Sequence, residues 1–280
     1  MKKYLGEFLS DPRVVKLPRW LWLPILHGIV LRTRPAKSAE KYQQIWTAEG
    51  SPLAVHTMRQ AVLLQEELGI PVKYAMRYGK PSVRSALAGM QDPVVIPLYP
   101  QYAESTTASV ADVLPEGVPM IESFHDHPAY IDALASNVRR HWQQHGRSPM
   151  LVMSFHGLPQ KGAERYELEC QTTAALLAAK LGLAQAAWKT TFQSRFGYAD
   201  WLQPYTEPTL VALAGEGLKR IDVVCPGFVC DCLETLEEIG ITARRAFRAA
   251  GGQDLCLIPC LNESAEWISA LAQIASARVA

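Results

Sequence analysis

The sequence has no excess of charge of either sign. Its 28 Lys and Arg residues, against 27 Asp and Glu residues, give a formal net charge of +1 over 280 residues. Proteins that bind nucleic acid normally show a basic face or stripe, so the composition does not favour a nucleic-acid partner. The chain also lacks low-complexity tracts and long blocks of like charge, which argues against disorder. With 49% hydrophobic residues, it can build one large domain or two of modest size.

A run of apolar residues long enough to span a membrane is also missing. The longest apolar stretch near the start, residues 17–31, is too short to cross a bilayer and is interrupted by Pro24 and Gly28. It is typical of a helix buried against the core, of an apolar lip over a hydrophobic ligand, or of a patch resting on a membrane surface. Because no signal peptide is recognisable, we expect a cytoplasmic protein. Residues 20–30, from Trp20 to Val30, are the candidate for peripheral contact with the inner membrane.

Cysteines are few, and they are not spaced as in a disulfide-rich secreted scaffold. All six lie in the second half of the chain and are expected to be reduced thiols. The spacing Cys225-x4-Cys230-x-Cys232 lacks the second pair that a structural zinc site would use. Residues 124–127 contain two histidines, His125 and His127, that could share one face of an extended segment. Neither pattern is a strong metal signature.

Two signatures of common α/β enzymes are absent. No Gly-rich phosphate loop of the Rossmann or P-loop type occurs, which disfavours a nucleotide cofactor. No Gly-x-Ser-x-Gly motif occurs either, which argues against an α/β-hydrolase. The candidate catalytic residues are therefore side chains outside a phosphate-binding loop or a nucleophilic serine motif.

The second half of the chain alternates short apolar runs with helical patterns. This alternation predicts a parallel sheet with helical crossovers. The expected strands are residues 150–155, 187–192, 221–225 and 255–259, and the expected helices are residues 166–181, 206–216 and 233–238.

The first half repeats the alternation with one strand fewer. The expected strands are residues 72–77, 94–98 and 120–124, and the expected helices are residues 1–9, 41–68, 83–90 and 131–145. We therefore predict an N-terminal α/β domain over residues 1–146 that lacks its first strand, and a C-terminal α/β domain over residues 147–263. A final helix over about 264–280 is expected to pack back on the N-terminal domain.

Two segments combine a strand end with titratable side chains. His156 ends the first strand of the second half, and such strand ends form the ligand-binding edge of an open α/β sheet. An imidazole there can bind a divalent metal or accept a proton near neutral pH. Asp231, Glu234 and Glu238 follow a later strand end. A helix cap through Asp231 and Glu234 would explain two of them. A shared cation or proton would explain why Glu234 and Glu238, four residues apart, are tolerated together.

Taken in order along the chain, these segments resemble the ferrochelatases of bacterial haem biosynthesis. The resemblance covers nearly the whole sequence, and ordered runs of this kind are far more specific than one motif. They include Ser154-Phe155-His156-Gly157-Leu158-Pro159, and the matching runs are residues 4–15, 45–53, 76–82, 97–102, 154–159, 192–197, 201–206 and 225–228.

The resemblance implies two flavodoxin-like, doubly wound parallel-sheet domains with a porphyrin cleft between them. It implies that His156 and the opposing Glu234 are the catalytic and metal-binding pair. It places residues that line or support the porphyrin at Arg77, Tyr78, Tyr102, Ser105, Thr106, Trp201, Asp231 and Glu238. It also matches residues 20–30 to the apolar segment that covers the macrocycle.

The activity implied is insertion of Fe²⁺ into protoporphyrin IX, with release of two protons, as the last step of haem synthesis. The partners are then the porphyrin and Fe²⁺, with the enzyme expected to be a monomer that needs no organic cofactor. Members with an iron–sulfur cluster carry a Cys after the Pro-Gln-Tyr run, where this chain has Glu104. No such cluster is therefore expected.

Two further departures from the family pattern leave alternatives open. Family members normally begin earlier, with a strand and a Leu-Gly-Thr-Pro-like loop, which agrees with the strand missing from the first half. The loop after His156, residues 160–166, is a few residues shorter than usual. The alternatives are a non-catalytic porphyrin- or haem-binding protein, or a chelatase for coproporphyrin, sirohydrochlorin or another metal.

Overall fold

A four-stranded parallel sheet forms the centre of the second half. The computed structural model describes residues 1–196 and 199–279, so Gly197 of the 192–197 run and Ala280 of the predicted last helix lie outside the described residues. The sheet has the order β2-β1-β3-β4. Each strand lies within two residues of its predicted position, with the bounds β1 (Leu151–His156), β2 (Trp188–Gln193), β3 (Arg220–Val224) and β4 (Asp254–Leu257).

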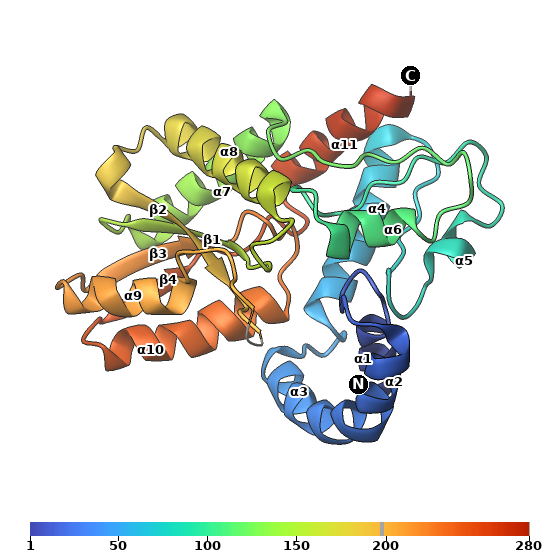
Figure 1. Cartoon of the computed structure of the whole chain (residues 1–280). Helices are drawn as coiled ribbons and strands as arrows, with labels where there is room; N and C mark the ends of the chain where they lie inside the picture. Colours follow the sequence, from blue (N-terminus) through green and yellow to red (C-terminus); the bar gives the residue numbers. More distant parts are fainter. Residues whose placement is uncertain (197–198, 280) are drawn as a thin grey trace.

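Both faces of this sheet are covered by helices, as Figure 1 shows. Alternate strand residues point to opposite faces, so Met153 and Phe155 join one core cluster, whereas Val152 joins another. The helices on the first face are α7 (Pro128–His145), α8 (Glu164–Leu181) and α11 (Ala265–Val279). The second face is covered by α9 (Thr206–Gly215), the π-helix η4 (Glu234–Ala243) and α10 (Arg244–Ala249), and the 3₁₀ turn η3 (Gln185–Ala187) leads into β2.

The three strands predicted in the first half are not formed, which corrects the prediction for this half. Among the described residues, segments 72–77 and 94–98 make no ladder with each other. Val95 forms one isolated parallel bridge with Met120, and Met76 forms another with the nearby Ser82. Both segments instead line a single cavity that separates them. Outside its helices, the hydrogen bonds of this half therefore run mainly through turns and side chains. Its helical elements here are α4 (Pro52–Leu68), α5 (Val83–Leu87), η2 (Glu104–Ala108) and α6 (Ser109–Ala111).

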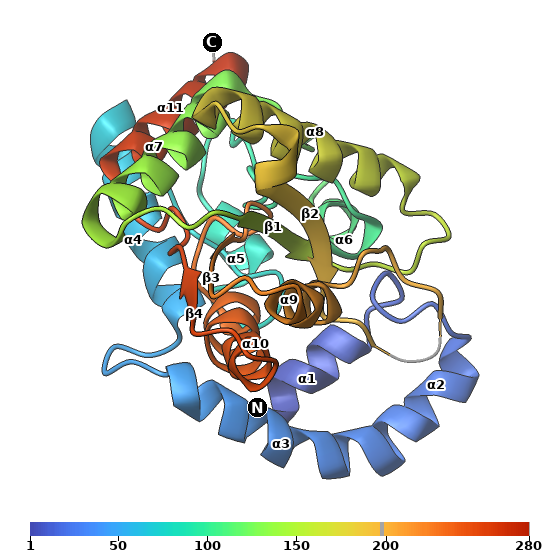
Figure 2. The ribbon, with the colours of Figure 1, turned by 90° about the vertical axis from the view of Figure 1, so that its left-hand side faces the viewer.

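The predicted helix over residues 41–68 is two helices. The first ends at Ile45 and the second begins at Pro52, because Gly50 at φ +124° and the proline at position 52 form a turn between them. Before this break, the chain forms the arc seen at the bottom of Figure 2. The arc consists of α1 (Lys2–Leu9), α2 (Arg19–Ile25), η1 (Leu26–Val30) and α3 (Leu31–Ile45).

The last helix joins the two halves. α11 packs on α4 and α7, and its fully buried Trp267 contacts Phe124 and Tyr130 in one aromatic cluster. α7 in turn lies on the sheet, where the Tyr130 hydroxyl donates to the carbonyl of Pro226. In the described part of the chain, no helix is long and apolar enough to span a membrane.

Candidate active site

A cavity of about 2480 Å³ lies between the carboxyl edge of the sheet, the π-helix η4 and the first half of the chain. Ligand sites commonly measure about 300–1,000 Å³, so this cavity is unusually large. It continues from the sheet edge into the space between segments 72–77 and 94–98. Of the ten residues predicted for the site, nine line it: Arg77, Tyr78, Tyr102, Ser105, Thr106, His156, Trp201, Glu234 and Glu238.

His156 lies at the end of β1, and one of its two ring nitrogens is already hydrogen-bonded within the protein. Its Nδ1 lies 2.7 Å from the carbonyl oxygen of Gly157, which can only accept, so Nδ1–H is the donor. The Tyr166 hydroxyl fixes the backbone by donating to the His156 carbonyl at 2.8 Å. The tautomer leaves the Nε2 lone pair of His156 free to bind a metal or take a proton.

Gly157 allows the chain to turn directly after the histidine. A Cβ at this position would lie 2.5 Å from the Gln193 carbonyl oxygen and 3.3 Å from the Trp201 ring. The Gly157 amide itself donates to that carbonyl at 2.7 Å. A larger residue would therefore push the β1 end away from β2 and displace His156.

Glu238 is the carboxylate whose ionisation depends on His156. The Ser194 amide and hydroxyl each donate to it at 2.6 Å. Burial raises the pKa of Glu238 above its ordinary value, the Ser194 hydrogen bonds and His156 oppose this rise, and Glu234 adds to it. Ser194 adopts φ +66°, a left-handed conformation that is uncommon for serine and that clusters at functional sites.

Glu234 lies one π-helical turn before Glu238 and faces a group of phenols. Desolvation, reinforced by the negative charge of Glu234, raises the pKa of Tyr42 to about 12. The same charge acts on Tyr4 and Tyr99, and all three phenols line the cavity. Tyr4 and Tyr42 come from α1 and α3, and the sequence carried no local signal for them.

The third carboxylate of η4 has a structural role. The buried Glu237 accepts from Lys41 at 2.9 Å and from the Thr242 hydroxyl at 2.9 Å. Lys41 belongs to α3, so this ion pair ties the N-terminal arc to the π-helix across the cavity. Glu234 has no ion-pair partner within the described residues, and its charge remains available to a ligand.

Arg77 and Tyr78 are organised by a buried acid that the sequence analysis did not single out. Asp11 accepts from Arg77 at 2.6 Å, from the Tyr78 hydroxyl at 2.8 Å and from the Ser109 hydroxyl at 2.7 Å. Burial would raise the pKa of Asp11, but these hydrogen bonds and that from the Arg13 amide outweigh it and lower the pKa. The Arg77 guanidinium is therefore fixed at the cavity wall, stacked 4.6 Å over the Tyr78 ring.

A neighbouring part of the rim carries Tyr102, Ser105 and Thr106. The Tyr102 amide donates to Glu169 at 2.6 Å, and the Arg165 guanidinium stacks 3.9 Å over the Tyr102 ring. Ser105 and Thr106 lie in η2, directly after this loop. The rim thus combines hydroxyls with cationic side chains, which suits carboxylate groups of a ligand.

Trp201 presents an unused donor. It lines the cavity, and its Nε1 is buried without a hydrogen-bond partner among the described residues. A buried unpaired donor is costly, so an acceptor from a bound ligand would satisfy it.

Asp231 lies behind the cavity rather than on its surface. It accepts from the Thr235 hydroxyl at 3.1 Å and from the Asn262 side-chain amide at 2.7 Å. It does not cap η4 as the sequence suggested, because the π-helix begins with no side-chain cap. Asp231 thus fastens the start of η4 to the loop after β4.

Residues 20–30 cover α1 and do not line the cavity. Leu26 is fully buried against Leu5, Leu9 and Leu31. Trp20 and Ile29 point outward, with 79% and 62% of their surfaces exposed. The parts of the arc that face the cavity are instead α1, through Tyr4 and Phe8, and α3, through Lys41 and Tyr42.

Comparison with known proteins identifies the family directly. The ferrochelatase family profile matches residues 1–279. The ferrochelatase of Aromatoleum aromaticum is 53% identical to the chain, in an alignment covering all of the chain and 83% of the relative. That of a Polaromonas species is 52% identical over all of the chain and 82% of the relative.

Two solved structures share the fold at low sequence identity. CbiX, described as the terminal enzyme of siroheme biosynthesis in denitrifying bacteria, matches with a TM-score of 0.57 at 14% identity, covering 82% of this chain and 95% of CbiX. SirB from Bacillus subtilis, solved with Fe³⁺, matches with a TM-score of 0.57 at 12% identity, covering 81% and 91%. These likenesses establish the α/β chelatase-type fold. Because the family profile matches residues 1–279 and the two relatives are 53% and 52% identical to it, the chain belongs to the ferrochelatase family of metal-chelating enzymes.

Proposed function

We propose that this protein inserts Fe²⁺ into protoporphyrin IX to form protohaem, the terminal step of haem biosynthesis, and that His156, Glu238 and Glu234 carry the chemistry. One observation supports this more than any other. A histidine with a free Nε2 and a carboxylate of raised pKa interact with each other in one large cavity lined with aromatic side chains.

The cavity suits a planar tetrapyrrole. Phe8, Tyr99, Trp201 and Phe228 give it aromatic walls, and such walls favour an apolar macrocycle. Arg77 at one part of the rim, and Ser105 and Thr106 at another, offer donors to the two propionates. The Nε1 of Trp201 is a further donor that lacks a partner.

We assign removal of the pyrrole protons to His156 and Glu238. Each inserted Fe²⁺ replaces two protons, which must leave the macrocycle one after the other. The Nε2 of His156 accepts a proton, and the resulting positive charge favours ionisation of Glu238. A carboxylate with a raised pKa accepts a proton more readily than an ordinary carboxylate does, so Glu238 relays the proton away from the ring.

Delivery of the substrate metal falls to Glu234. Its carboxylate has no ion-pair partner within the described residues, and the rigid π-helix places it one turn from Glu238. Oxygen and imidazole ligands suit Fe²⁺. We therefore assign the metal path to Glu234 and His156.

The experiment that tests this function compares His156→Ala with His27→Ala, an exposed histidine outside the cavity. We measure anaerobic insertion of Fe²⁺, or of Zn²⁺ as a fluorescent surrogate, into protoporphyrin IX. We expect loss of at least about a hundredfold in turnover for His156→Ala, unchanged porphyrin binding by the Soret shift, and normal turnover for His27→Ala.

Near-normal turnover by His156→Ala would contradict the catalytic assignment. Porphyrin binding without turnover by the unmodified chain would instead indicate the non-catalytic binding protein. Coproporphyrin and sirohydrochlorin, assayed in parallel, test the choice of tetrapyrrole.

The remaining expectations are also proposals. The reaction as written needs only the porphyrin and Fe²⁺, with no organic cofactor and no iron–sulfur cluster. We propose a cytoplasmic monomer that touches the inner membrane through residues 20–30. The exposed Trp20, Leu21 and Ile29, flanked by Arg19 and Arg32, support this contact. Flotation with anionic vesicles, compared between the unmodified chain and Trp20→Glu, tests it.

A further inference from the structure

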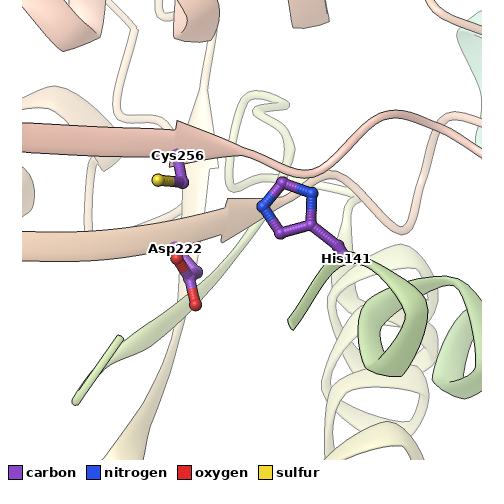
Figure 3. Close-up of side chains that lie close together, drawn as sticks. All are labelled: His141, Asp222 and Cys256. Carbon is purple, nitrogen blue, oxygen red and sulfur yellow. The ribbon is translucent and has the colours of Figure 1, made fainter. Parts of the chain in front are cut away.

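A second group of metal-ligand side chains lies at the opposite end of the sheet from the cavity. His141 comes from α7, Asp222 from β3 and Cys256 from β4, and their ligand atoms all lie within 4.8 Å of one another. Figure 3 shows the His141 ring beside the two strands that carry the other side chains. Asp222 is paired with Leu151 at the start of β1, whereas His156 ends that strand. The cluster is thus about 16 Å from His156 along the strand.

Asp222 is a fully buried carboxylate without an ion-pair partner. It accepts from the Trp142 indole at 2.7 Å, from the Ser148 amide at 2.9 Å and from the Ser148 hydroxyl at 2.6 Å. Among the described residues, no Lys, Arg or His lies within salt-bridge distance of it. Buried charges are normally paired or coordinate a metal, so a cation beside Asp222 would remove an electrostatic cost.

His141 supplies an unused ring nitrogen. Its Nε2 is buried and has no hydrogen-bond partner within the described chain. His145 stands four residues later on the same helix face, with its ring 4.6 Å away. Two histidines at this spacing are a familiar pair of zinc ligands.

Cys256 completes the group from the neighbouring strand. It pairs with Asp222 in the register of β3 and β4, so both side chains lie on the same face of the sheet. Arg220 donates to its sulfur at 3.4 Å, and the thiol itself donates to the Asp254 carboxylate at 3.1 Å. Arg220 is itself balanced by Asp254 at 4.0 Å.

The charge and the geometry of this cluster both favour a divalent transition-metal ion. Binding of the metal displaces the Cys256 thiol proton to solvent, and the resulting thiolate and the Asp222 carboxylate together neutralise a divalent cation. Two neutral imidazoles add no charge. In a tetrahedral zinc site the ligand atoms are separated by about 3.3–3.7 Å. The three side chains would need to close by only about 1 Å to reach this geometry. The mixture of sulfur, nitrogen and oxygen ligands selects borderline transition metals rather than Mg²⁺ or Ca²⁺.

We propose that His141, Asp222 and Cys256, with His145 as the fourth ligand, form a second metal site that takes Zn²⁺ or a similar divalent transition metal. The site joins the C-terminal end of α7 to β3 and β4. It therefore fastens α7, which lies in the N-terminal half of the chain, to the sheet of the C-terminal half. It lies apart from the cavity and does not depend on the proposed function.

Cobalt titration of the full chain tests the site, because Co²⁺ bound to a thiolate gives a charge-transfer absorption in the near ultraviolet. We use His156→Ala as the background to remove metal binding in the cavity. We expect one equivalent of Co²⁺ to produce the thiolate band. Cys256→Ser should abolish it, and His141→Gln should weaken the apparent affinity at least about tenfold.

Cys232→Ser, which changes a thiol beside the cavity, is the matched control and should keep the band. Zn²⁺ should also raise the Tm of the background protein but not that of Cys256→Ser. Absence of a thiolate band at saturating Co²⁺ would overturn the proposal. So would a band that survives Cys256→Ser, or one that is lost only in Cys232→Ser.

Discussion

The sequences of the two halves show the same alternation of strand-like and helical segments, but only in the second half do the strand-like segments pair into a sheet. In the second half, β1 forms six residue pairs with β2 and three with β3. In the first half, segments 72–77 and 94–98 remain separated by the cavity, and Val95 makes a single bridge with Met120. A parallel sheet requires each strand to meet a neighbour along its length. Local strand propensity alone therefore does not form one.

The first half compensates with side-chain hydrogen bonds. Asp11 joins the N-terminal arc to the loop at Arg77 and Tyr78. Gln60 of α4 donates to the carbonyl of Asn262 in the second half. Such contacts fix a few points, whereas a ladder fixes every residue. The half that holds the wide cavity is therefore also the half with fewer backbone constraints.

Hydrogen exchange should show the largest contrast between the halves. The amides of β1 are expected to exchange only through opening close to global unfolding, about 5–15 kcal/mol for a typical domain. Those of residues 72–77 should exchange through local opening of nearly zero cost, because their hydrogen bonds are local, as in Met76 to Pro81. Mass-resolved exchange measures both. Equal protection would show that the first half is as constrained as the sheet.

A matched pair of core truncations should give the next largest difference. Ile221 in β3 is fully buried, and Ile221→Ala should cost about 2–5 kcal/mol in the free energy of unfolding. Ile96 is partly buried and already lines the cavity, so Ile96→Ala should cost less than half as much. Urea unfolding of both variants is the measurement. Similar costs would mean that the first half packs as tightly as the second.

Asp11→Asn tests whether a single buried acid stabilises the first half. It removes the charge that pairs with Arg77 and disturbs three further hydrogen bonds. We expect a loss of about 2–4 kcal/mol in the free energy of unfolding. The control is Asp112→Asn, which breaks the exposed pair with Arg13 and should cost under about 1 kcal/mol. A loss no greater than that of the control would argue against this role.

Glu238→Gln should give the smallest stability change, with a sign set by pH. Because the folded state raises the pKa of Glu238, the folded chain holds this proton more tightly than the unfolded chain does. The ionised carboxylate therefore costs stability above the folded pKa, and this cost vanishes below the ordinary value near about 4.3. At neutral pH we expect the variant to have a slightly higher Tm than the unmodified chain, which corresponds to a gain of less than about 1 kcal/mol in the free energy of unfolding. At acidic pH the two proteins should have the same Tm.

Thermal melts across this range provide the measurement. An advantage of Glu238→Gln that grows on acidification would reverse the assigned pKa direction. Turnover of the same variant should fall, because an amide cannot relay a proton.

The fold of the second half could be read from the sequence almost in full. Apolar runs such as residues 150–155 match the observed strands, because strands buried on both faces are continuously apolar. The same signal in residues 72–77 and 94–98 did not produce strands. Whether such a run pairs depends on a neighbour at about 4.8 Å, and no local pattern reports that distance.

The candidate site was predictable to a similar extent. The sequence identified His156, Glu234 and Glu238, because strand ends and clustered carboxylates are local patterns. It did not identify Tyr4, Tyr42 or Asp11, which reach the site from the N-terminal arc. It also grouped Asp231 with the residues that line or support the porphyrin, and that side chain turns toward Asn262 behind the cavity.

The sequence by itself determined the α/β class, the helices and strands of the second half, and the position of His156 at a strand end. These follow from periodicity and residue type within a few positions. Only the tertiary structure decided that Glu238 interacts with His156, that the cavity extends between segments 72–77 and 94–98, and that His141, Asp222 and Cys256 meet. Those relations join residues far apart in the chain, so their distances are set by how the elements pack against one another.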